Sequence, residues 1–220
     1  MKGLVGMAAG RYGGIFAEAA RSAAGFTVST DAQVALVRVL GRPTAVMYRS
    51  DAGESRRRRE TGLVAITRMD LLDLLLSLPC EWPVPCRSLT GRERRLLRSL
   101  PAGSIEIGNG TVIRRAVVPL TVELAAVRAY DWRRGLDQAS LLAPFCSRAV
   151  VLERVPDDVD ALLAEAAYYG VGVVVVQAAE VRVLADPEPF SRQGHKAAGW
   201  WFAEEIYAQV SGSAAAGCLA

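Results

Sequence analysis

The run VGVVVVQ at residues 171–177 constrains the fold more than any other stretch of this chain. An unbroken apolar run rich in β-branched residues is typical of a strand that is covered on both faces of its sheet. Directly before it, PDDVDALLAEAAYYG (156–170) predicts a helix, because a proline and three acidic residues begin it and Gly170 ends it. SRAVVLERV (147–155) predicts a further strand before that helix. The order strand, helix, strand predicts an α/β fold.

The segments before this core extend the same alternation. PLTVELAAVRA (119–129) predicts a buried strand, and DWRRGLDQASLLAPF (131–145) predicts a helix with Asp131 as its N-cap. SIEIGNGTVIRRAVV (104–118) holds an Asn-Gly pair between two β-rich runs, which is a strong hairpin signal. Further elements are a helix over 88–103 with Thr90 as N-cap, a strand VRVLAD (181–186) and a last helix, GHKAAGWWFAEEIYAQV (194–210). Together these predict a mixed sheet flanked by helices.

The N-terminal third predicts a smaller, β-rich part. AQVALVRVLG (32–41) and TAVMYRS (44–50) predict two strands, and LVAITR (63–68) predicts a third. Between the second and third, SDAGESRRRRETG (50–62) is charged and rich in turn residues, so we expect a solvent-exposed hairpin loop. RMDLLDLLLSLP (68–79) predicts a helix that stops at Pro79.

The segment CEWPVPC (80–86) carries two prolines and predicts a linker. It divides the chain into a β-hairpin and helix part over 31–79 and a larger α/β domain over 88–210. A flexible arm over 1–30, in which residues 15–24 are expected to be either loosely ordered or a short helix, and a disordered tail over 211–220 complete the expected organisation.

Composition argues against several classes of protein. The four cysteines are irregularly spaced and His195 is the only histidine, so a zinc site lacks ligands at useful intervals. A disulfide framework is not expected either, and we predict a reduced, cytoplasmic protein. No segment reaches the roughly 18 to 20 continuous apolar residues of a membrane helix, so no membrane partner is expected.

Three clusters of arginine suggest binding of phosphates, since the guanidinium group combines charge with forked hydrogen bonds. The alternative is that these arginines only solvate helix faces and loop tips. The arginines predicted to bind nucleic acid are Arg56, Arg57, Arg58, Arg59, Arg92, Arg94, Arg95, Arg98, Arg133 and Arg134. A winged-helix-like arrangement around 88–103 is one way to present such arginines to DNA, but CEWPVPCRS makes the turn after the preceding helix too long for a helix-turn-helix.

The stretch DWRRGLDQASLLAPFCSRAVVLERVPDDVDALLAEAAYYGVGVVVV, together with the hairpin before it, resembles the restriction-endonuclease-like, or PD-(D/E)XK, nuclease fold over about residues 104–185. The resemblance implies a restriction-endonuclease-like core. It also implies a Mg²⁺ site made of an acidic residue on one strand and a Glu-x-Lys further on, in which the lysine helps to activate water.

The catalytic set of that family is missing here. Counted from Asp131, the Glu-x-Lys positions fall on Ala126-Val127-Arg128, and placing Glu123 in the glutamate position puts Ala125 where the lysine belongs. The remnants of a site are Glu106, Glu123 and Arg128. We therefore expect no catalytic residues, no metal and no cofactor, with Mg²⁺ required only if a rearranged site survives.

Three functional hypotheses follow. The first is a catalytically inactive nuclease-fold protein that binds nucleic acid, with DNA as the candidate, or assembles a protein complex. The second is an active Mg²⁺-dependent DNA nuclease with a rearranged site. The third is a structural homo-oligomer that binds no nucleic acid. His195, Trp200 and Trp201 at the last helix are expected to serve that helix rather than catalysis, unless the tryptophans prove exposed.

Overall fold

The computed structural model of the chain describes residues 14–23, 28–177, 180–191 and 196–217. The chain forms two compact units. Unit 1 consists of the residues up to Arg49 together with Val122–Ser191, and unit 2 consists of Ser50–Thr121 together with the residues from Arg192 onward. This division differs from the predicted one, in which 31–79 and 88–210 form successive parts. Pairing between strands that are distant in the sequence produces the difference.

Unit 1 is built on a six-stranded sheet that is mixed, as predicted, but that also includes the two strands expected in a separate N-terminal part. The strands are β1 (Gln33–Val39), β2 (Arg42–Ser50), β6 (Leu120–Ala129), β7 (Ser147–Leu152), β8 (Val171–Gln177) and β9 (Glu180–Ala185), in the spatial order β1-β2-β6-β7-β8-β9. β6, β7 and β8 run parallel, while β1 with β2 and β8 with β9 are antiparallel pairs. The valine run of β8 therefore lies inside the sheet, and Val171–Val175 are buried.

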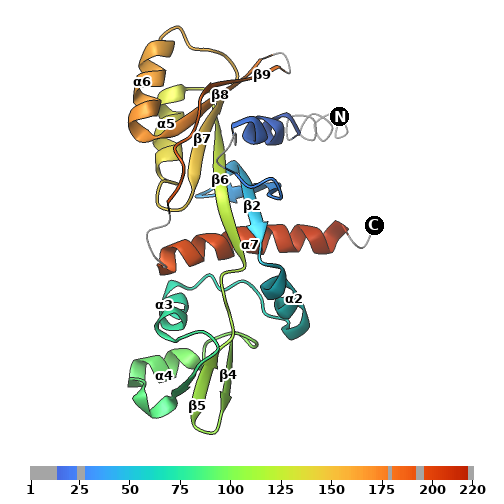
Figure 1. Cartoon of the computed structure of the whole chain (residues 1–220), viewed down its shortest axis with the longest axis vertical. Helices are drawn as coiled ribbons and strands as arrows, with labels where there is room; N and C mark the ends of the chain where they lie inside the picture. The colour runs from blue at the N-terminus through green and yellow to red at the C-terminus, as the bar shows by residue number, and fades with distance from the viewer. Residues whose placement is uncertain (1–13, 24–27, 178–179, 192–195, 218–220) are drawn as a thin grey trace. The chain divides into compact units, whose positions relative to one another are not determined.

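Helices flank both faces of this sheet. Gly135 of α5 (Trp132–Ser140) lies directly against Val150 of β7, and α6 (Val159–Tyr169) follows beside α5 (Figure 1). The neighbouring β7 residues, Ala149 and Val151, point to the opposite face and pack in a cluster with the helix over residues 14–23. The short N-terminal helix is thus confirmed. The prediction of a loosely ordered arm is wrong for residues 14–23, because their apolar side chains belong to the core.

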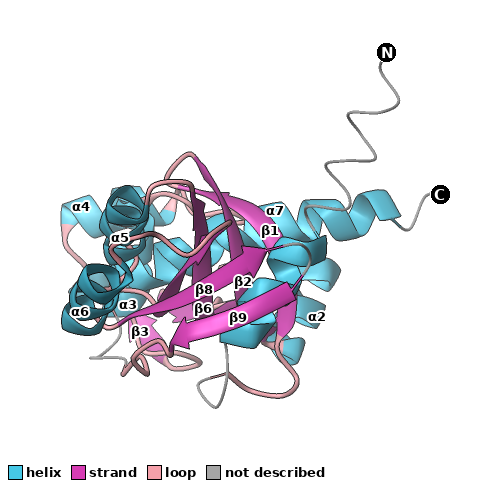
Figure 2. Cartoon of the chain, turned by 90° about the horizontal axis from the view of Figure 1, so that it is seen from above, coloured by secondary structure: helices cyan, strands magenta, loops and turns pink. Residues whose placement is uncertain are grey.

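Unit 2 combines helices with a small antiparallel sheet, and Figure 2 colours both by type. Its elements are α2 (Ala52–Thr61), α3 (Met69–Ser77), β3 (Pro83–Pro85), the 3-10 helix η1 (Cys86–Ser88), α4 (Gly91–Leu97), β4 (Ile105–Gly108), β5 (Thr111–Arg114) and α7 (Ala197–Gly217). The sheet has the order β3-β5-β4. The predicted hairpin is confirmed, and Asn109 and Gly110 have φ values of 51° and 72°, as a type I′ turn requires.

Helix α3 is the central support of unit 2. On one side Leu71, Leu72 and Leu75 pack with Trp200 of α7, and on the other side Leu74 and Leu78 pack with α4 and β5. The helix is apolar enough to supply both interfaces, which explains its nearly continuous run of leucines.

Two predictions for the segment after β2 are wrong. Residues 52–61 form α2 instead of an exposed loop, because the Asp51 side chain accepts a hydrogen bond from the Glu54 N–H and Gly62 ends the helix in the left-handed conformation. Residues 63–68 form no strand. Leu63 and Ile66 are instead buried as part of the core that α3 and α7 share.

The expected linker and tail also have structure. Within residues 80–86, β3 pairs with β5, so the two prolines mark an edge strand of the small sheet. Helix α7 continues to Gly217 and includes most of the expected tail. Residues 218–220 lie outside the described part of the chain.

Replacing either of two helical glycines by alanine should change the stability of the protein in opposite directions. A Cβ at Gly135 would lie 2.5 Å from Val150 Cγ2 and 2.8 Å from Ala129 Cβ, whereas a Cβ at Gly199 would meet no atom within 4 Å. We expect Gly135→Ala to destabilise the protein by roughly 1–3 kcal/mol through overpacking. Gly199→Ala should stabilise it by roughly 0.5–1 kcal/mol. Thermal unfolding of both variants checks this, and equal effects would contradict the packing described for α5.

Candidate nucleic-acid interface

Helix α4 has one apolar side and one basic side. Leu97 is buried, and Leu96 and Leu100 pack against the same cores. Arg92, Arg94, Arg95 and Arg98 are exposed, and at 100° per residue they cover the arc of the helix opposite those leucines. The helix is fixed at its beginning by a capping box, in which Thr90 and Glu93 bond each other's backbone N–H.

The exposed guanidinium groups of α4 are not neutralised within the described structure. No ion pair between described residues involves Arg92, Arg94, Arg95 or Arg98. The one carboxylate on the same helix, Glu93, is engaged in the capping box, and its hydrogen bonds from the Thr90 backbone N–H and hydroxyl hold its pKa below the ordinary value.

Helix α3 and the small sheet surround α4. Helix α3 packs against α4, and the β4–β5 hairpin follows α4 in the chain and pairs with β3. The Cys86 N–H donates to the Gly110 carbonyl at 2.8 Å and so ties the hairpin turn to η1, directly before α4. Helices α3 and α4 and the β4–β5 hairpin thus share one apolar core.

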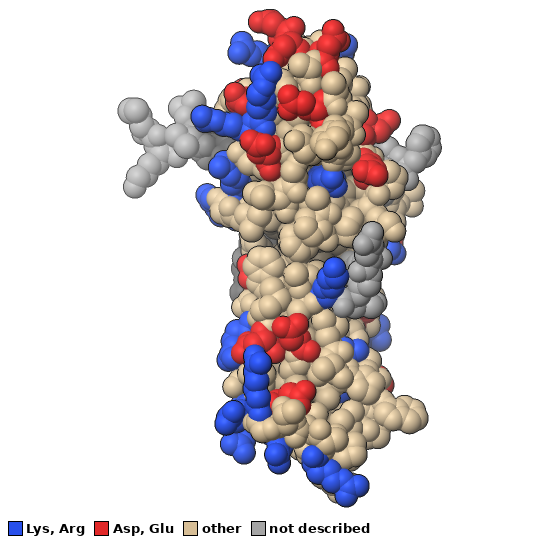
Figure 3. Space-filling model, turned by 90° about the vertical axis from the view of Figure 1, so that its left-hand side faces the viewer, with Lys and Arg blue, Asp and Glu red and all other residues tan. Residues whose placement is uncertain are grey.

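The charge of the chain is concentrated in this region. Residues 50–121 contain 12 arginines and 8 acidic residues, a net charge of 12 − 8 = +4, whereas the whole chain has a net charge of +3. Figure 3 shows basic side chains gathered at the bottom of the view, where Figure 1 draws α4 and the β4–β5 hairpin. A local surplus of guanidinium groups raises the affinity for polyanions.

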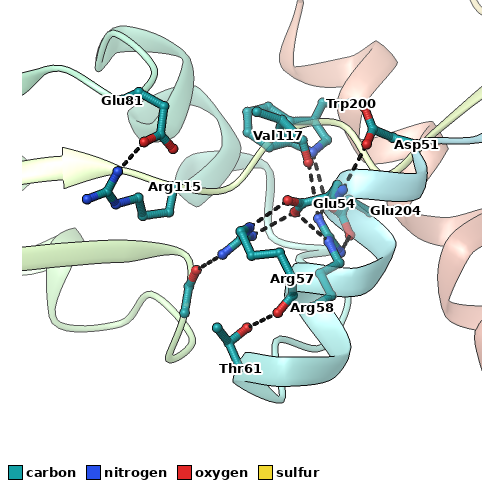
Figure 4. A network of polar contacts seen from close by, with 11 residues as sticks. Asp51, Glu54, Arg57, Arg58, Thr61, Glu81, Arg115, Val117, Trp200 and Glu204 are labelled. Carbon is teal, nitrogen blue, oxygen red and sulfur yellow. Dashed lines mark hydrogen bonds and ion pairs between the residues drawn. The ribbon is translucent and has the colours of Figure 1, made fainter.

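Arg58 is not available to nucleic acid, in contrast to the prediction from the RRRR run. Its side chain is fully buried and donates to Glu204 at 2.6 and 2.8 Å and to Glu54 at 2.7 Å (Figure 4). Glu204 also accepts hydrogen bonds from the Ile66 N–H and from Trp200 Nε1. The run is a helix rather than a loop, and one face of that helix packs on α7.

The other arginines of α2 differ from one another in exposure. Arg57 is partly buried and pairs with Glu54 at 2.7 Å while it donates to the Gly103 carbonyl. Arg56 and Arg59 are exposed. Two of the four predicted contacts on this helix, those of Arg56 and Arg59, thus remain open to solvent.

Of the adjacent arginines Arg133 and Arg134 in unit 1, Arg133 has interaction partners nearby. Arg133 lies over the Trp132 ring, 3.9 Å from its centroid, and pairs with Asp158 at 3.0 Å. Trp132 Nε1 also donates to Asp158. Arg134 is exposed, and Asp131 caps α5 as expected by accepting from the Arg134 N–H. Arg133 therefore supports the packing of α5 on the loop before α6.

Glu123 is paired with cationic and polar groups rather than with another carboxylate. It accepts from Arg49 Nε at 2.5 Å and from the N–H and hydroxyl of Ser29 at 2.7 and 3.0 Å. Burial alone would raise its pKa, but these hydrogen bonds and the charge of Arg49 lower the pKa below the ordinary value. The carboxylate is ionised at neutral pH, and Arg49 neutralises it.

The other two remnants also form ion pairs. Glu106 binds Arg115, which binds Glu81 as well, and these three residues belong to unit 2. Arg128 binds Glu153 and lies over the Tyr130 ring in unit 1. Over the ranges that the structure describes, no group of three or more His, Cys, Asp and Glu side chains could hold a metal ion. His195 lies outside those ranges.

Trp82 is an exposed residue of this region that we did not predict from the sequence as a functional residue. Its side chain is 69% exposed, next to Pro83 at the start of β3. The signal was a tryptophan between an acidic residue and a proline in CEWPVPC, which we interpreted only as a linker. Trp200, by contrast, is buried, as expected for a packing residue, and Trp201 is half-buried.

Comparisons with protein-family models, with curated proteins and with solved structures give no match for this chain. None of the helices in the described residues is both long and apolar enough to cross a membrane.

Removal of the Glu204 carboxylate should destabilise unit 2. We expect Glu204→Ala to destabilise this unit by about 3–5 kcal/mol, since it leaves the Arg58 charge partly uncompensated in the core. Arg56→Ala, on the exposed side of the same helix α2, is the matched control and should change stability by less than about 0.5 kcal/mol. Chemical denaturation of both variants checks this, and similar small effects would contradict the burial of Arg58.

Proposed function

We propose that this protein binds duplex DNA through α4 and the β4–β5 hairpin of unit 2 and does not cleave it. The observation that carries the proposal is the set of four exposed arginines on α4, which have no ion-pair partner among the described residues. Such a helix can contact phosphates on both sides of a groove, while the hairpin turn at Asn109-Gly110 contacts the adjacent backbone.

We also propose that unit 1 has the fold of a nuclease but lacks nuclease activity. The hairpin that the resemblance included, β4–β5, belongs to the small sheet of unit 2 instead, and β2 lies beside β6 in the six-stranded sheet. With β1 and β2 in place of that hairpin, the order of β1, β2, β6, α5 and β7 is compatible with a restriction-endonuclease-like core. In such nucleases a carboxylate on the strand that corresponds to β6 would hold Mg²⁺ with a second carboxylate. Here the β6 carboxylate, Glu123, binds Arg49 of β2 instead. A guanidinium in this place repels a divalent cation, which supports the inactive alternative.

Binding through arginine and phosphate predicts a steep dependence on salt. We expect the affinity of the full chain for a 20-base-pair duplex to fall with rising salt concentration. The double variant Arg92→Glu/Arg95→Glu should weaken binding at least tenfold. It should also lower the slope of log affinity against log salt concentration by about one per lost phosphate contact. The matched control is Arg154→Glu/Arg182→Glu, which reverses two exposed arginines of unit 1. Fluorescence anisotropy at several salt concentrations measures both.

Two results would contradict the proposed function. Equal loss in both double variants would show that total charge matters rather than the α4 surface. Nicking of the duplex in the presence of Mg²⁺ or Mn²⁺ that disappears in Glu123→Ala would show that the protein is an active nuclease.

A further inference from the structure

Trp82 is held in solvent although tryptophan side chains are usually buried. Its exposed fraction is 69%, against 6% for Trp132 and 3% for Trp200. A large apolar ring in this position gains stabilisation from contact with a partner, since folding of the chain leaves most of its surface in water.

The backbone on both sides of Trp82 is fixed. Glu81 has a φ of 59°, an unfavourable conformation for a residue other than glycine. It is held there because its N–H donates to the Arg114 carbonyl at 3.0 Å and its carboxylate binds Arg115. On the other side Pro83 begins β3 and pairs with Ile113 of β5. The indole therefore projects from a rigid sheet edge rather than from a mobile loop.

We infer that Trp82 is a stacking site for an unpaired nucleobase, so that the protein binds a junction between duplex and single-stranded DNA. The inference rests on the proposed function of α4. It is favoured over a protein contact because Trp82 directly precedes β3 of the three-stranded sheet, within residues 50–121, the part of the chain that has the surplus of arginines. An exposed aromatic ring beside a basic surface is the arrangement by which proteins bind single strands.

The spacing along the chain fits one continuous nucleic acid. Trp82 and Arg87 are five residues apart, and an extended chain of that length spans at most about 18 Å. At about 3.4 Å per stacked nucleotide, this span corresponds to at most about five nucleotides. Arg87 is exposed and lies in η1, three residues before α4 begins at Gly91. A strand that passes Arg87 can therefore reach Trp82 within about five nucleotides.

The test compares three DNA probes with the full chain: a 20-base-pair duplex, a 20-nucleotide oligothymidine, and the duplex with a ten-thymidine overhang. We expect Trp82→Ala to weaken binding of the oligothymidine and of the overhang duplex by about five- to 150-fold, the loss of one stacked base. Binding of the blunt duplex should change less than twofold. Val64→Ala, which truncates another exposed apolar residue of unit 2 outside α4 and the β4–β5 hairpin, is the matched control and should bind all three probes as the wild type does.

Intrinsic fluorescence provides a second readout. Stacking on a base should quench the wild-type tryptophan emission when the oligothymidine binds, and Trp82→Phe should lose most of this quenching while keeping more affinity than Trp82→Ala. Thermal unfolding of each variant reports whether it is folded, and the conservative Trp82→Phe variant keeps the test open if Trp82→Ala does not fold.

The outcomes separate this inference from the proposed function. Duplex binding that depends on Arg92 and Arg95, with single-strand affinity and quenching unchanged by both Trp82 variants, would overturn the stacking site alone. No binding of any probe at low salt would overturn the proposed function and the stacking site with it. A loss of self-association by light scattering in Trp82→Ala, without any change in DNA affinity, would show that Trp82 contacts a second copy of the chain and would also overturn the inference.

Discussion

Unit 2 depends on the buried ion pairs that the guanidinium of Arg58 forms with Glu204 and Glu54. Burial lowers the pKa of this group, but the hydrogen bonds and charges of Glu204 and Glu54 raise it above its ordinary value, so the arginine stays charged in the core. A buried ion pair of this kind contributes little net stability compared with apolar packing, yet removing one partner is costly. Its effect is geometric, since the planar group joins α2 to α7 in one fixed arrangement.

The candidate interface follows from that arrangement. Helix α7 packs against one side of α3, and α4 and the β4–β5 hairpin pack against the other side. Because the arginines of α4 lie opposite its buried leucines, fixing α3 also fixes the direction in which those arginines point. The network of Figure 4 thus supports a charged surface to which it contributes no residue of its own.

Elements with local signals could be predicted from the sequence, and elements that depend on distant contacts could not. The Asn109-Gly110 hairpin, the Thr90 cap of α4 and the valine run of β8 are each specified within a few residues. The RRRR run is different, because Arg56 and Arg58 are equivalent in sequence. Only the position of Glu204, 146 residues after Arg58, decides that one is buried while the other is exposed. The same holds for Arg49 and Glu123, whose pairing depends on β2 lying beside β6.

Amide hydrogen exchange of the full chain, with and without a saturating 20-base-pair duplex, tests the central claim most directly. We predict slower exchange over residues 86–114, which include η1, α4 and the β4–β5 hairpin, and unchanged exchange over α5 and α6. Protection confined to α5 and α6, with no change over residues 86–114, would contradict it.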